Sequence, residues 1–221
     1  MSCFLCCGCC VEASKEEQEP LSSGSRIQKQ VIVLEKGNKL VVKKVNVAIH
    51  DEKFSEIAEL YNKQVDYYVT MKDCLSQLKN GNTSAGLASC IETLKTKHNN
   101  YDIQIQMEGY NFSLEIKAAK DIPDDLKNAQ EVMTRLSQAT KLLLGTQTRL
   151  GGMIFSLSQE KNKMANDIQE VNTGYLDQIR LVGNLEENIQ NIDKAKQLSK
   201  EYEEEANKVF MEIAEIAGVT I

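Results

Sequence analysis

The sequence predicts an α+β protein that is mainly α-helical. Only two prolines interrupt its 221 residues, so long helices can run without a breaker. Two stretches alternate apolar and polar residues as strands do, and an apolar seven-residue repeat runs through the second half of the chain. We therefore expect a small ββααββ unit, two β-hairpins around two helices, followed by a long coiled-coil or helical-bundle segment.

The N-terminal residues predict an anchor and a linker that stand apart from this fold. Residues 1–10, MSCFLCCGCC, hold five of the seven cysteines of the chain. Residues 11–27 combine acidic residues, serines, one proline and one glycine without hydrophobic periodicity. Such a segment cannot bury enough apolar surface to offset its chain entropy, so we expect a flexible linker there.

The small α+β domain is expected over residues 28–120. Its first hairpin is predicted in KQVIVLEKGNKLVVKKVNVAI, where two β-branched runs flank the loop KGN. A helix capped by Asp51 follows, with apolar residues at helical spacing as far as Leu78, and a shorter helix is expected over 84–97. The stretch YDIQIQMEGYNFSLEIKA then alternates with a period of two and predicts the second hairpin.

Residues 121–221 are expected to be helical, and they carry the apolar heptad repeat. Asp121 and Pro123 suit the start of a helix. Spacings of three and four residues place the apolar positions on one face, and a strict heptad favours a coiled coil with another helix. We expect a helix-interaction stripe formed by Leu136, Leu143, Leu150, Ile154, Leu157, Ile168, Val171, Val182, Leu185, Ile189 and Ile192.

Gly151 and Gly152 interrupt this repeat, because each glycine costs about 1 kcal/mol relative to alanine inside a helix. The heptad keeps its phase across the pair, which favours a continuous or kinked helix. A turn between two antiparallel helices, giving a bundle folded on itself, is the alternative.

Composition and motifs favour a protein that is not an enzyme. The net charge of -6 disfavours a nucleic-acid partner. Phosphate loops, dinucleotide fingerprints and nucleophile or zinc motifs do not occur in the sequence, so we expect no catalytic residue, metal site, cofactor or small-molecule substrate. His50 and His98 are expected at the surface, and Cys74 and Cys90 are expected to be packing residues.

The cysteines of the tip are predicted to be S-acylated. Their uneven distribution is not that of a secreted disulfide framework, and no apolar stretch is long enough to cross a bilayer. Thioester-linked acyl chains anchor a protein stably when two or more are present. The predicted lipidation sites are Cys3, Cys6, Cys7, Cys9 and Cys10.

These features together predict a lipid-anchored peripheral membrane protein on the cytoplasmic face of the plasma membrane or a vesicle. Its expected partners are membrane lipid, through the acyl chains, and another helical protein or a second copy, through the stripe. Its role would be that of a scaffold, tether or trafficking component. A thiolate site for metal or redox chemistry in the same cysteine cluster is an alternative.

The residues around Gln178 give a further alternative. Ile168, Val171 and Tyr175 precede this glutamine, and Val182, Leu185, Ile189 and Ile192 follow it, at the spacing of successive helical layers. Over residues 154–192 the chain thereby resembles the acylated SNARE proteins of vesicle fusion. The resemblance implies a fusion factor that folds with other helices around a layer formed by Gln178.

Overall fold

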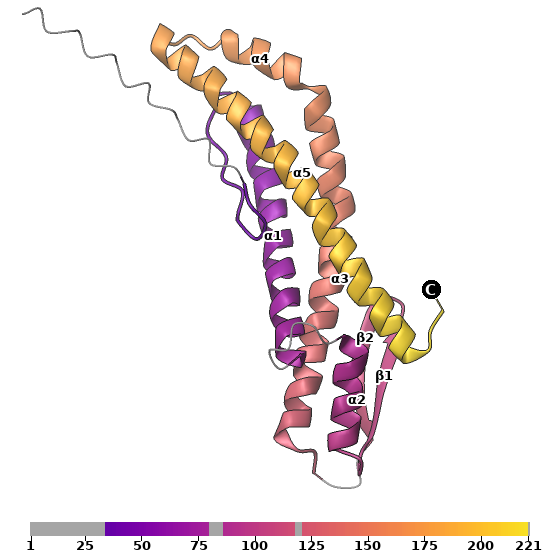
Figure 1. The fold of residues 1–221 in the computed structure, drawn as a ribbon. Helices are drawn as coiled ribbons and strands as arrows, with labels where there is room; N and C mark the ends of the chain where they lie inside the picture. The colour runs from indigo at the N-terminus through magenta and orange to yellow at the C-terminus, as the bar shows by residue number, and fades with distance from the viewer. Residues whose placement is uncertain (1–33, 80–85, 118–120, 221) are drawn as a thin grey trace, which may run out of the picture. The chain divides into compact units, whose positions relative to one another are not determined.

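Helices dominate the structure, a computed structural model that describes residues 34–79, 86–117 and 121–220 (Figure 1). The predicted anchor and linker lie outside the described residues. The described part of the chain holds five helices and one antiparallel hairpin, which confirms a mainly helical α+β fold. In chain order these are α1 (Ala48–Leu78), α2 (Leu87–Lys97), β1 (Asp102–Glu108), β2 (Asn111–Lys117), α3 (Asp124–Gln159), α4 (Lys161–Gln169) and α5 (Tyr175–Ala217).

Three long helices form the core of the fold. The α3 helix packs against α1 and against α5, and α1 also contacts α5 (Figure 1). Apolar residues at helical spacing on α1, among them Phe54, Ile57 and Tyr61, are almost completely buried. The periodicity of residues 51–78 therefore reflects packing on two other helices, which is the usual source of helix stability in proteins.

The chain reverses direction between α3 and α5, and not at the paired glycines. The α3 helix continues through Gly151 and Gly152, which confirms the preference for a continuous helix there. It ends at Gln159, and α4 and a short loop lead into α5, which returns alongside α3 (Figure 1). The heptad repeat is consequently shared between two antiparallel helices, so each helix can bury part of the other's apolar face.

The second hairpin forms as predicted. β1 and β2 pair in antiparallel register around Gly109, whose φ of 56° suits a tight turn. Side chains of α3 extend its hydrogen bonding: Ser137 Oγ accepts from the Phe112 N–H at 2.9 Å, and Gln130 Nε2 donates to the Leu114 carbonyl at 3.0 Å. The hairpin thus covers one end of α3.

The first predicted hairpin is wrong in the described residues, so the ββααββ unit does not form. Val31 and Val33 lie outside the described part, but residues 34–47 are described and contain no strand. The expected KGN turn is present, with Gly37 at a φ of 85°. Beyond it the chain runs extended between α1 and α5, because side chains of these helices take up its backbone hydrogen bonds. We call residues 34–47 the strap.

Candidate interaction surface

The α3 part of the predicted stripe lies inside the molecule. Its members are 2 % exposed or less and pack between α1 and α5. A polar position of the same repeat is accommodated locally, since the Thr140 hydroxyl donates to the Leu136 carbonyl at 2.8 Å. The buried residues of the stripe on α3 are Leu136, Leu143, Leu150, Ile154 and Leu157.

The members of the stripe that follow α3 differ in burial. Ile168, Leu185 and Ile192 are buried. Val171, Val182 and Ile189 are half-buried and lie at the edge of the core. On α5 one row of the heptad therefore packs on the bundle, while the neighbouring row faces solvent along part of its surface.

Gln178 stabilises the connection between α4 and α5. Its Nε2 donates to the Ile168 carbonyl at 2.6 Å, and its Oε1 accepts from the Thr173 hydroxyl at 3.1 Å. Both partners lie in the segment that precedes α5. In this structure the glutamine at the centre of the SNARE-like spacing is thus engaged within its own chain.

Large apolar side chains are exposed where α5 begins. Tyr175 is 79 % exposed, Leu176 80 % and Ile179 53 %. Together with half-buried Val182 they form what we call the α5 patch. A shallow hollow of about 400 Å³ follows the patch and is bordered by Gln169 of α4 and by residues of α5.

The α5 patch is only partly visible in the sequence pattern. Tyr175 and Val182 belong to the heptad repeat, but Leu176 and Ile179 lie outside its two apolar positions. Two large apolar residues off the buried face of an amphipathic helix are the signal that identifies this surface. The preceding Gly174, at the N-cap of α5, marks the start of the exposed turns.

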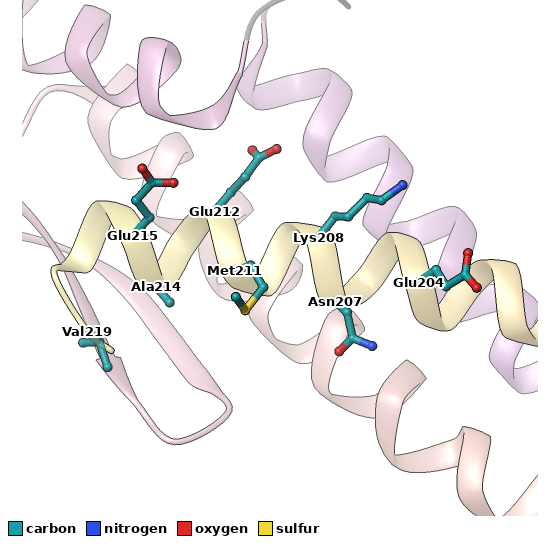
Figure 2. A pocket seen from close by; sticks show the side chains of 8 residues that line it. All are labelled: Glu204, Asn207, Lys208, Met211, Glu212, Ala214, Glu215 and Val219. Carbon is teal, nitrogen blue, oxygen red and sulfur yellow. The ribbon is translucent and has the colours of Figure 1, made fainter. Parts of the chain in front are cut away.

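A second hollow lies along the C-terminal end of α5 and has a volume of about 810 Å³. Figure 2 shows Asn207 and Met211 on one side of the helix and the charged side chains of Lys208 and Glu212 on the other. Met211 is exposed, and Val219 borders the hollow. This surface is open and mixed in character, with less contiguous apolar area than the α5 patch.

The described cysteines are packing residues. Cys74 is fully buried, Cys90 is half-buried, and both are free thiols. Burial raises the pKa of each thiol, which lowers the population of the nucleophilic thiolate at neutral pH. The five predicted lipidation sites, Cys3 to Cys10, lie outside the described residues.

The prediction that both histidines are ordinary surface residues is wrong. His50 on α1 is 1 % exposed, and its Nε2 lies 2.8 Å from Asp167 Oδ2 on α4. His98 is half-buried, with its Nε2 2.9 Å from Asp125 Oδ2. Each ring thus ties together two elements that are distant in sequence.

Neither a metal-binding cluster nor a membrane-spanning helix occurs in the described residues. Residues 34–79, 86–117 and 121–220 contain no group of three or more His, Cys, Asp or Glu side chains placed to hold a metal ion. In the same ranges no helix combines the length and apolar character needed to cross a bilayer.

Comparisons with known proteins give no relative for this chain. No protein-family model matches it, and no curated protein or solved structure shows significant similarity. Its function is therefore inferred from its own residues and geometry.

Proposed function

We propose that the protein is a non-enzymatic peripheral membrane protein that presents a helical surface to a protein partner at the cytoplasmic face of a membrane. S-acylation of the cysteines in residues 1–10 anchors it, and the described helical fold carries the interaction. The role is that of a scaffold, tether or trafficking component.

The α5 patch is the observation that carries the interaction. Most of the heptad stripe is buried within the chain, so it is not free to meet another helix. Tyr175, Leu176 and Ile179 remain exposed at adjacent positions of one helix. Aromatic and aliphatic residues clustered on a helix face are typical of helix-mediated protein interfaces.

The anchor is supported by the sequence of the tip. Five thiols in ten residues give several acylation sites, and two or more acyl chains are enough for stable attachment. An anchored chain meets its partner at a raised local concentration, so a modest apolar patch suffices for binding.

Site-specific photo-crosslinking in cells tests this function. A photoreactive residue at Leu176 should give a discrete adduct in the membrane fraction, whereas one at Lys200, exposed elsewhere on α5, should not. The adduct should disappear when Tyr175 and Ile179 are both changed to serine, although thermal stability is retained because these side chains are exposed.

A five-serine variant, in which Cys3, Cys6, Cys7, Cys9 and Cys10 are all changed to serine, separates the anchor from the interaction surface. Loss of the Leu176 adduct in this variant would show that the partner is met at the membrane. An adduct pattern that is the same at Leu176 and Lys200, or one unaffected by the double serine change, would contradict the role of the α5 patch.

A further inference from the structure

The strap lies between α1 and α5 as a bound peptide would lie in a groove. Asn62 of α1 accepts from the Leu40 N–H at 2.7 Å and donates to the Leu40 carbonyl at 3.0 Å. Asn188 of α5 makes the same pair of bonds to Lys43, at 2.8 and 2.7 Å. Each asparagine thus pairs with both backbone groups of one strap residue.

Two further groups of α5 complete this backbone recognition. Tyr202 Oη accepts from the Gly37 N–H at 2.8 Å, and Asn184 Nδ2 donates to the Lys44 carbonyl at 2.8 Å. These bonds do not depend on the identity of the side chains in the extended segment. A different extended chain can therefore make them, as in recognition modes where main-chain bonds give affinity and side-chain pockets give specificity.

Charge gives the groove its selectivity. Lys36 Nζ lies 2.6 Å from Glu205 and 3.2 Å from Glu201, both on α5. On the α1 side Lys39 lies 3.0 Å from Asp66. The walls of the groove are acidic where the strap is basic, so complementarity favours a lysine-rich occupant.

A third paired lysine and two apolar contacts complete the pattern. Lys43 lies 2.6 Å from Glu187. Leu40 and Val45 are 2 % and 0 % exposed, whereas Val41 between them is 75 % exposed. The groove therefore selects lysines at the positions of 36, 39 and 43 and apolar side chains at the positions of 40 and 45.

The strap can leave the groove without unfolding α1. Asn46, near the end of the strap, turns the chain towards α1, and among the described residues it is the one non-glycine with a positive φ, 61°. The first backbone bonds of α1 run from His50 and Asp51 to the Val47 carbonyl, so they do not involve the strap upstream of this corner. One side-chain bond crosses the corner, from the Val45 N–H to Asp51 Oδ1 at 2.7 Å, and it breaks when the strap leaves, without loss of a backbone bond within α1. The corner is thus a natural hinge.

An empty groove would raise the free energy of the folded chain. This favours exchange of the strap for another segment over simple release of the strap. Asn188 is fully buried, and without the strap its side-chain amide would lose both backbone partners. An incoming extended segment restores those bonds. We propose that the groove between α1 and α5 binds an extended, lysine-rich segment of a partner protein and that the strap occupies this groove in the isolated chain.

This inference deepens the proposed interaction function and is tested without membranes, so its failure is distinguishable from failure of the anchor or of the α5 patch. The probe is a fluorescent peptide with the strap sequence LEKGNKLVVKKVNV, and binding to the purified full chain is followed by anisotropy. The resident strap competes at the high effective concentration of a tethered ligand.

Weakening the resident strap should admit the peptide. The variant L40D with K43E removes one buried contact and reverses one ion pair, both on the strap, and leaves the groove unchanged. Its dissociation constant for the peptide should fall at least about tenfold below that of the wild type. The matched control, V41D with K44E, makes the same charge change at exposed strap positions and should bind the peptide as weakly as the wild type.

Selectivity is tested by changing the peptide and not the protein, so the result does not depend on whether a protein variant folds. Replacing its lysines with glutamates should abolish binding to the L40D, K43E variant. Equal binding of the two peptides, or equal binding by this variant and its control, would overturn the proposal. So would a wild-type chain found by light scattering to be a dimer with exchanged straps, since a second copy would then be the occupant.

Discussion

Leu185 and Ile179 lie on the same helix, and their truncation should have opposite consequences for stability and for binding. Leu185 is 4 % exposed against the bundle, and Ile179 is 53 % exposed in the α5 patch. Leu185→Ala removes three buried carbons at about 0.8 kcal/mol each and leaves a cavity, so the expected loss is about 3 kcal/mol. Ile179→Ala should cost less than about 1 kcal/mol, because much of its side chain already faces water.

Thermal and urea denaturation followed by far-UV circular dichroism measure this difference. For a chain of this size, about 3 kcal/mol corresponds to a fall in Tm of about 6–12 °C for Leu185→Ala, against no more than about 4 °C for Ile179→Ala. Crosslinking from Leu176 should show the reverse order, with the larger loss in Ile179→Ala. Equal destabilisation by the two changes would refute the division of α5 into a packed row and an exposed patch.

Three substitutions and one labelling experiment test separate parts of the structure. Gln64 is fully buried, and its side-chain amide has no hydrogen-bond partner among the described residues, so Gln64→Leu should raise the free energy of unfolding by about 1–2 kcal/mol in urea titrations. Tyr202→Phe removes the hydroxyl that accepts a strap N–H and meets a second buried tyrosine hydroxyl, and it should lower that free energy by about 1–2 kcal/mol; an unchanged value would contradict the role of this hydroxyl. The Lys97 ammonium lowers the pKa of Asp125 from 3.8 to about 2, so its stabilising effect is complete above 3.8 and is lost as the pH falls through 2. NMR titration of the carboxyl carbon should show this pKa rising towards its ordinary value in Lys97→Met. Cys74 should resist alkylation by iodoacetamide in the folded chain and react on unfolding, and rapid labelling under native conditions, detected by peptide mass spectrometry, would show that its thiol is accessible.

Elements in which apolar residues recur regularly over a long segment can be predicted from the sequence. The helix over 51–78 and the hairpin around Gly109 have apolar residues on one face of one element, and the structure buries that same face. Their periodicity is set by local geometry, so a single sequence contains enough information to place them.

The sequence of the strap predicts a hairpin strand because any extended chain has side chains that alternate with a period of two, whatever its backbone groups bind. The Val and Lys residues of 39–45 fit a strand, but their backbone groups pair with asparagine side chains that are distant in sequence, on α1 and α5. Only tertiary contact distinguishes these cases. His50 shows the same limit, since its burial depends on Asp167, which is 117 residues away.

The heptad repeat predicted helix packing but not the partner. A stripe at spacings of three and four needs another apolar surface, and that surface can belong to the same chain. The reversal between α3 and α5 supplies it for Leu143 and Leu185, whereas Ile179 lies outside the repeat and stays exposed. The proposed interaction surface thus lies where the repeat is least regular.

The most direct test of the proposed function is membrane fractionation combined with hydroxylamine treatment of the full chain. The wild type should sediment with membranes, carry a thioester-linked acyl label and move to the soluble fraction when hydroxylamine cleaves the thioesters. The variant with Cys3, Cys6, Cys7, Cys9 and Cys10 all changed to serine should be unlabelled and soluble from the start. A wild type that carries no label, or a five-serine variant that sediments with membranes as fully as the wild type, would contradict the anchor.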